Sequence, residues 1–323
     1  MAQLSKQQAH KCLEQACSQF RTFFEGKNYQ HRKSALMSSG IDPTVRFVGS
    51  HMNTLKADMN NRDIHSPIYI VQPCLKTKNI SSYEDPHFYP RYGSYYMSLG
   101  LLAPANCLEQ ICLDTHEYLL SCKSIHDQNI SYLVSSSDTE MLTALKRSLP
   151  KGIIHVDTLP EHKYDHQYGI NRVSGRVIRV MLQNDSDKEA EMIAVIALLT
   201  HEEEGHLFTE ATIGIASILK LTENLSNVMD VYPLSPLGNS CLHLQVEDIL
   251  VATIELYQEG LRPSNKHNRN RILKKYIKHL FALCEKLQLT PESIKNRIVE
   301  YEASTGQQET ISATLIEDLF KAK

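Results

Sequence analysis

The first group of residues that could do chemistry on a phosphate follows a predicted strand. Gln72 to Lys76 (QPCLK) comes directly after the β-branched run 68–71, and Lys78 and Arg91 follow it. Cations at the ends of strands in one sheet can hold phosphates through charge-assisted hydrogen bonds. Lysines on a solvated loop would give the same pattern. The segment is therefore either an anion-binding site or an ordinary solvated loop.

The second group lies between Gly260 and Leu280 (GLRPSNKHNRNRILKKYIKHL). Gly260 and Pro263 favour a turn, and Ser264 or Asn265 can cap the helix that follows. The formal charge of the whole chain is -3, so the positive charge is local. An apolar stripe at helical spacing predicts an amphipathic helix whose basic face either binds an anionic partner or is simply solvated. The stripe comprises Ile272, Leu273, Tyr276, Ile277 and Leu280, and the candidate binding residues are Arg262, Asn265, Arg269, Arg271, Lys274, Lys275 and Lys278.

Other motifs have structural interpretations. His201 and His206 (HEEEGH) are five residues apart and would point to different faces of a helix, so we interpret the segment as a solvated acidic turn and expect no metal site. Ser137 or Asp138 can cap a helix, and no glycine-flanked elbow surrounds the serines. The sequence has no Gly-rich phosphate loop, so any nucleotide would be held by side chains on a sheet.

The composition is that of a globular protein. The chain has 323 residues, with 42% hydrophobic and 22% charged residues. Apolar runs such as 192–199 are far below the roughly 20 residues of a membrane span. The amino terminus lacks the features of a signal peptide, and the eight cysteines are scattered, so we expect a cytoplasmic protein with reduced thiols and no membrane contact.

The periodicity predicts an α+β fold, with a mainly antiparallel sheet flanked by helices and a helical part at the end. Two prolines and a glycine in 232–240 place a domain boundary near residue 232, giving domains 1–232 and 233–323. The expected strands are 45–48, 68–71, 95–102, 130–134, 177–182 and 193–199, and the expected helices are 5–26, 107–122, 138–149, 211–228, 245–259, 264–285 and 291–303.

Several segments, in order, resemble the catalytic core of alanyl-tRNA synthetase, a class II synthetase, from about residue 20 to 285. The most specific likeness is Pro263-Ser264-Asn265 with the cationic register after it, which resembles the family segment P-S-N-x-G-R-G-Y-V-L-R-R. The other segments that resemble the family are Asp42-Pro43-Thr44 with Met52 to Lys56, Gln72-x-Cys74-Leu75-Lys76, Arg91 with Tyr95-Tyr96 and Leu99-Gly100, and Glu210 to Ile218 (EATIGIASI).

The resemblance implies a class II fold with a six-stranded antiparallel sheet that binds ATP, Mg²⁺ and an amino acid and forms an aminoacyl-adenylate. Lys76 and Arg91 would be catalytic, with Lys76 on the α-phosphate. Tyr95 or Tyr96 would lie against adenine, Gly214 falls in the third motif, and Glu210 would bind the α-ammonium group. The helix after Asn265 would face tRNA, and the first motif implies a homodimer.

The chain also departs from the family pattern. Ser217 stands where the family has the arginine that holds the γ-phosphate, and Arg172 or Arg176 is a candidate replacement. Met97 and Ile193 stand at polar positions of the family's amino-acid pocket, so alanine recognition would change or be lost.

Two functions follow. The first is an ATP-dependent ligase that activates an amino acid and passes it to tRNA or another acceptor. The second is a catalytically inactive, synthetase-like RNA- or protein-binding module. With no room for an editing domain after residue 285, we expect a truncated, free-standing paralogue.

Overall fold

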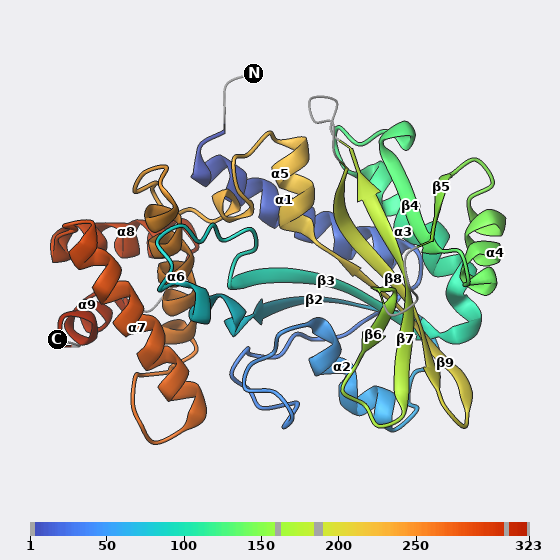
Figure 1. The fold of residues 1–323 in the computed structure, drawn as a ribbon, viewed down its shortest axis with the longest axis horizontal. Helices are drawn as coiled ribbons and strands as arrows, with labels where there is room; N and C mark the ends of the chain where they lie inside the picture. Colours follow the sequence, from blue (N-terminus) through green and yellow to red (C-terminus); the bar gives the residue numbers. More distant parts are fainter. Residues whose placement is uncertain (1–3, 159–162, 184–189, 307–309, 322–323) are drawn as a thin grey trace.

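A single mixed sheet organises the computed structural model, which describes residues 4–158, 163–183, 190–306 and 310–321. In this part of the chain the sheet has nine strands in the order β1-β2-β3-β9-β8-β7-β4-β5, with β6 paired to β7 (Figure 1). Only the outer pairs β1–β2 and β4–β5 are parallel. The strands are β1 Gln30–His31, β2 Ile68–Leu75, β3 Tyr95–Pro104, β4 Ile130–Ser135, β5 Ile153–Asp157, β6 Asp165–Gln167, β7 Val173–Leu182, β8 Glu191–His201 and β9 Gly205–Ile213.

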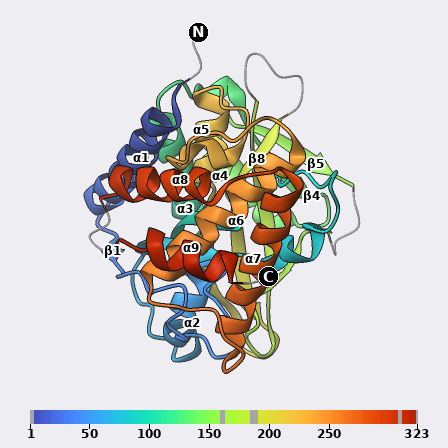
Figure 2. The ribbon, with the colours of Figure 1, turned by 90° about the vertical axis from the view of Figure 1, so that its left-hand side faces the viewer.

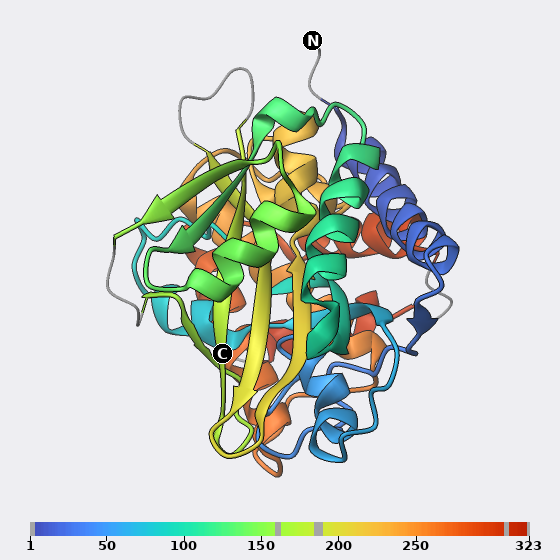
Figure 3. The same ribbon diagram turned by 90° about the vertical axis from the view of Figure 1, so that its right-hand side faces the viewer.

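Helices cover one face of this sheet, called here the core face. Along β3 the residues Leu99, Leu101 and Ala103 point into this core, as strand alternation requires. α1 and α5 lie above the left part of the sheet in Figure 1, and α3 and α4 lie in front of the strands in Figure 3. The helices are α1 Lys6–Gly26, α3 Leu108–Ser121, α4 Thr139–Ser148 and α5 Ile215–Thr222.

The opposite face, called here the α2 face, is covered by a smaller cluster. α2 (His51–Asn60) contributes Met52, Leu55 and Met59, which pack against strand residues such as Ile70 and Leu102. Ser50 begins this helix with a capping box that also involves Asn53. The residues of β3 that point here are Tyr96, Ser98 and Gly100, because they alternate with the core residues.

The carboxy-terminal part of the chain is helical, with α6 Cys241–Gln258, α7 Asn268–Lys286, α8 Pro291–Ser304 and α9 Ser312–Phe320 (Figure 2). α6 is buried on most sides and contacts both β3 and α7. The apolar stripe predicted for α7 is buried, which confirms its amphipathic character.

The segment between β2 and β3 is anchored to α6 by a buried carboxylate. Asp248 accepts hydrogen bonds from the Ser94 backbone N–H (2.6 Å), the Asn79 amide (2.9 Å) and the Tyr83 hydroxyl. The 3₁₀-helix η1 (Thr77–Ser82) lies in this segment. The 77–94 segment therefore has a fixed position although it is a long connection.

The predicted α+β fold is confirmed, with more strands than the six implied by the resemblance. Residues 45–48 are not a strand, because Val48 makes single backbone bonds to Met37 and Leu75 rather than a ladder. Residues 211–213 end β9, and α5 begins only after Gly214 and ends at Thr222, so the predicted helix 211–228 was wrong at both ends. α7 begins at Asn268 with His267 as its N-cap, not with Ser264 or Asn265. Sequence reasoning missed α2, α9 and the strands β1, β5, β6 and β9. The division at residue 232 stays a prediction.

Candidate functional sites

Glu210, the residue predicted to bind an ammonium group, lies on β9 at the centre of the α2 face. Its carboxylate accepts hydrogen bonds from the Tyr168 hydroxyl (2.9 Å) and the Thr212 hydroxyl. His51 Nε2 lies 3.4 Å from Glu210 Oε1. Glu210 is 3% exposed and His51 is 0% exposed. The position predicted for the ligand's ammonium group is thus filled by side chains of the chain itself.

Two glycines make room for the side chains that cover Glu210. A Cβ added at Gly100 on β3 would lie 2.2 Å from His51 Cδ2, and one at Gly175 on β7 would lie 2.4 Å from Tyr168 Cε2. Both rings therefore lie directly on the backbone of the sheet. His51 is fixed further by Ser98, whose hydroxyl is 3.1 Å from Nδ1. The α2 face is closed by close packing at this point.

Burial controls the charges in this closed site. It lowers the pKa of His51 from 6.5 to about 3, because the imidazolium would be poorly solvated. Burial also raises the pKa of Glu210 to about 7, and the hydrogen bonds from Thr212 and Tyr168 oppose that shift. At neutral pH His51 is therefore uncharged, and the pair is not a salt bridge.

Lys76 and Tyr96, two of the predicted ATP ligands, lie together on the α2 face. The Lys76 ammonium is 4.6 Å from the centroid of the Tyr96 ring, a cation–π distance. The Tyr96 hydroxyl donates to the Gly49 carbonyl. Tyr95 points to the core face, where its ring is 5.3 Å from that of Tyr232. Of the two tyrosines, only Tyr96 shares a face with Lys76.

Four further predicted ligands lie elsewhere. Ile193 is buried in the core, and Met97 packs against the same core, so neither shares a face with Glu210. Arg176 forms ion pairs with Asp138 (2.7 Å) and Glu140 at the start of α4. Arg172 pairs with Glu203 in the turn between β8 and β9. The predicted ligands of ATP and the amino acid therefore do not converge on one site.

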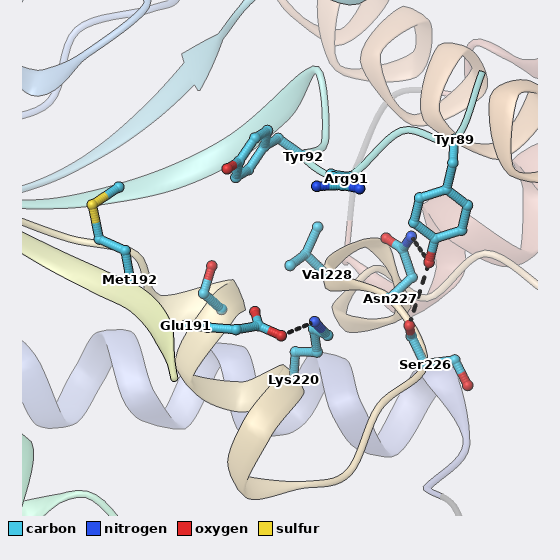
Figure 4. A pocket seen from close by; sticks show the side chains of 10 residues that line it. Tyr89, Arg91, Tyr92, Glu191, Met192, Lys220, Ser226, Asn227 and Val228 are labelled. Atoms are coloured by element: carbon cyan, nitrogen blue, oxygen red, sulfur yellow. Dashed lines mark hydrogen bonds and ion pairs between the residues drawn. The ribbon is translucent and has the colours of Figure 1, made fainter. Parts of the chain in front are cut away.

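A pocket of about 360 Å³ contains Arg91 and Ser217 (Figure 4). It lies where β3 and β8 begin, next to α5. Gly214 is the N-cap of α5 and accepts a hydrogen bond from the Ser217 backbone N–H (3.0 Å). Lys220, one turn further along α5, pairs with Glu191. The full lining is Tyr89, Arg91, Tyr92, Glu191, Met192, Ser217, Lys220, Ser226, Asn227 and Val228.

A groove of about 510 Å³ runs between α7 and the 77–94 segment. Three cations line it, Lys275 and Lys278 from α7 and Arg46 from the loop before α2, against the single carboxylate of Glu84. The loop of Arg46 is tied to α7 because Arg269 Nε donates to the Arg46 carbonyl. We call this surface the cationic groove.

The other predicted RNA-binding residues bond mostly to their own loop. Arg262 donates to the Tyr257 carbonyl (3.0 Å) and stacks on the Tyr257 ring. Arg271 Nε donates to the Asn265 carbonyl (3.1 Å), and Lys274 Nζ donates to Asn265 Oδ1 (3.2 Å). The structure thus gathers only Lys275 and Lys278 of the predicted set in the cationic groove.

Sequence reasoning missed three residues that shape these sites. His51 and Tyr168 belong to no recognisable motif. Their role is seen only in the structure, where their rings pack on the backbone of Gly100 and Gly175. Arg46 could have been suspected from its charge, but nothing in the sequence places it beside α7. The acidic segment 202–204 is a turn between β8 and β9, as predicted.

Comparisons with known proteins show distant likenesses. No protein-family model matches the sequence, and no curated protein matches it. The RNA binding domain of threonyl-tRNA synthetase from Cryptosporidium parvum Iowa II is 10% identical with a TM-score of 0.43, over 69% of this chain and 64% of that chain. This chain therefore spans less than two thirds of that protein.

Two other solved structures extend the comparison. Apo histidyl-tRNA synthetase from S. aureus is 8% identical with a TM-score of 0.47, over 84% of this chain and 85% of that chain. Asparaginyl-tRNA synthetase from Entamoeba histolytica, in complex with asparaginyl-adenylate, is 7% identical with a TM-score of 0.42, over 70% and 66%. These values establish no family for the chain.

The described residues were also compared with what a membrane span and a metal site require. None of their helices is long and apolar enough to cross a membrane. No group of three or more His, Cys, Asp or Glu among them is arranged to hold a metal ion.

Proposed function

We propose that the protein binds RNA through the cationic groove and is a synthetase-like binding module rather than an amino-acid-activating enzyme. The observation that carries the proposal is the charge of the groove, where Arg46, Lys275 and Lys278 face one carboxylate. Phosphates of a nucleic acid backbone are bound by such clusters of Lys and Arg.

The surface around the groove extends the same charge. The sequence from 262 to 278 contains seven Lys or Arg residues and no Asp or Glu. In the described part of the chain, none of these seven lies within ion-pair distance of a carboxylate, whereas Arg62, Arg172 and Arg176 all do. A cationic surface without internal counter-charges on a chain of net charge -3 favours an anionic macromolecule as partner.

The choice of RNA rests on the sequence resemblance of Pro263-Ser264-Asn265 and the register after it to the tRNA-facing segment of alanyl-tRNA synthetase. The alanyl-specific likeness and tRNA as the particular partner belong to this proposal. A carrier acceptor and a homodimer stay predictions.

Amino-acid activation is the second candidate, favoured by the adjacency of Lys76 and Tyr96 on the α2 face. Against it stand the closed surroundings of Glu210 and the internal ion pairs of Arg172 and Arg176. The test is ATP-dependent pyrophosphate exchange with Mg²⁺ and each amino acid in turn. If the protein catalysed exchange above background and Lys76→Ala abolished it, the protein would be an amino-acid-activating ligase and our proposal would be wrong.

The proposed function is tested by filter binding of unfractionated tRNA over a series of salt concentrations. We expect the logarithm of the affinity to fall linearly with the logarithm of the salt concentration, with a slope shallower by roughly 1 for each phosphate that a variant no longer binds. Lys275→Glu with Lys278→Glu should make the slope shallower by roughly 2. The matched control is Lys146→Glu with Lys151→Glu, which makes the same charge change at exposed positions outside the groove. An equal decrease in affinity in both double variants would refute the groove as the site.

A further inference from the structure

The pocket of about 360 Å³ beside α5 has features that RNA binding in the cationic groove does not explain. Figure 4 shows Arg91 between two groups of lining residues. Tyr92 and Met192 lie on one side of it, and Tyr89 and Asn227 lie on the other. None of Lys76, Tyr95, Tyr96, Arg172 and Arg176 lines it. Of the side chains that the resemblance assigned to ATP, the pocket therefore contains Arg91, and Ser217 lines it at the position of the family's γ-phosphate arginine.

The walls of this pocket are held together by one buried amide. Asn227 Nδ2 donates to the Tyr89 hydroxyl (2.8 Å) and to the Pro90 carbonyl (3.3 Å), and Asn227 Oδ1 accepts from the Met229 backbone N–H (2.9 Å). Asn227 is buried, and its bonds to the Pro90 carbonyl and the Met229 N–H are shielded from water. The pocket is thus preformed rather than a gap between loose loops.

Apolar side chains that folding would normally bury are exposed here. Tyr92 is 69% exposed, Met192 is 47% exposed and Tyr89 is 41% exposed, and all three line this pocket. Single exposed apolar residues are ordinary, but a cluster of them in a concave site of a few hundred Å³ is typical of a ligand pocket.

The charges in the pocket leave one cation available. Lys220 and Glu191 neutralise each other by their ion pair. Arg91 is exposed and, within the described residues, has no hydrogen-bond or ion-pair partner. Its planar guanidinium can bind a carboxylate or phosphate with two parallel hydrogen bonds.

We propose that this pocket binds a small ligand that combines a flat aromatic ring with a single anionic group. The anion lies on Arg91, and the ring lies against Tyr92 and Met192. A triphosphate is disfavoured, because only one cation in this described pocket lacks a partner and the Glu191 carboxylate forms part of the wall. The ligand class therefore differs from ATP.

The test is isothermal titration of the whole protein with three monoanionic aromatic probes, namely 4-hydroxybenzoate, indole-3-acetate and orotate. At least one should bind with a dissociation constant of about 1 mM or lower, and indole or acetate alone should bind at least about tenfold more weakly. Arg91→Gln and Tyr92→Ala should each weaken binding about tenfold or more. Both residues are exposed, so the variants should fold, and Arg147→Gln is the matched control at an exposed position outside the pocket.

Three outcomes would overturn the proposal. The first is that none of the three probes binds the wild-type protein, and the second is that Arg91→Gln binds as the wild type does. The third is that ATP with Mg²⁺ binds more tightly than every monoanionic probe and that this binding is lost in Arg91→Gln. The pocket would then be a nucleotide site. Binding of tRNA in the groove is measured separately, so either proposal can fail alone.

Discussion

The imidazole of His51 lies against the carboxylate of Glu210, with 3.4 Å between Nε2 and Oε1, at a point where both side chains are cut off from solvent. The first turn of α2 thus covers the centre of the sheet. Because the ring rests on the backbone of Gly100, a ligand could reach Glu210 only after His51 had moved. This pairing is the main reason for preferring a binding function over amino-acid activation.

We predict that His51 makes stability depend on pH. Its folded-state pKa is depressed, so below pH 6.5 the unfolded chain binds a proton that the folded chain excludes. The free energy of unfolding of the wild type, minus that of His51→Gln, should therefore rise by about 1.4 kcal/mol for each pH unit between pH 3 and 6.5. Urea unfolding across this interval measures it. His87→Gln, at an exposed position, is the control, and a pH-independent difference for His51→Gln would contradict the prediction.

Gly100→Ala should destabilise the protein by about 1–3 kcal/mol, because the added methyl group would overlap the His51 ring. In a His51→Ala background the same change should cost less than about 1 kcal/mol, so the two substitutions are coupled. Gly26→Ala is the control, since a Cβ there meets nothing within 4 Å. Additive effects in chemical denaturation would show that the ring does not rest on Gly100.

Asp248→Ala should destabilise the protein by about 2–4 kcal/mol, because Ser94, Asn79 and Tyr83 would be deprived of a buried acceptor together. Asp318→Ala should cost only about 1 kcal/mol, since within the described residues Asp318 accepts a hydrogen bond from Tyr257 alone. Hydrogen exchange should also become faster in 77–94 in the Asp248 variant. Unchanged exchange there would mean that other interactions hold this segment.

Lys275→Ala should weaken tRNA binding about threefold to tenfold at low salt, and Lys274→Ala should weaken it less than about twofold. The difference arises because Lys274 is half-buried and donates to Asn265, whereas Lys275 is exposed in the cationic groove. Both lysines are on α7, so each is the control for the other. If Lys274→Ala weakened binding more than Lys275→Ala, the RNA would bind on the Lys274 side of α7 and not in the cationic groove.

Much of the fold could be predicted because its signals are local. α1 was predicted from the spacing of Leu13, Ala16, Cys17, Phe20 and Phe24, and all of them except Ala16 are buried. β8 was predicted from its unbroken apolar run, although it extends further at both ends than 193–199. The helix expected at 211–228 began too early because Ala211 and Ile213 fit a helical spacing as well as a strand, and the pairing of β9 with two neighbours decides between them.

The site was harder to predict because its determinants are not local. Which face of the sheet a residue points to depends on strand register, and this places Tyr95, Met97 and Ile193 away from Glu210. The cations Arg172 and Arg176 acquired acidic partners through interactions between separate elements. A motif comparison places residues along the chain but carries no information about which side chains fill the space between them.

The place of β9 in the sheet has a consequence for how the chain acquires its structure. β9 lies between β3 and β8, and it is the last strand in the described sequence. β2 and β3 can pair early as neighbours, and β7, β8 and β9 can form a meander of adjacent strands. The two halves join only when Phe208 to Ile213 pairs with a strand more than 100 residues earlier. This non-local pairing loses the entropy of closing a long loop before its stabilising contacts form, so we expect it to limit the folding rate. It can occur only after residue 213 has been synthesised.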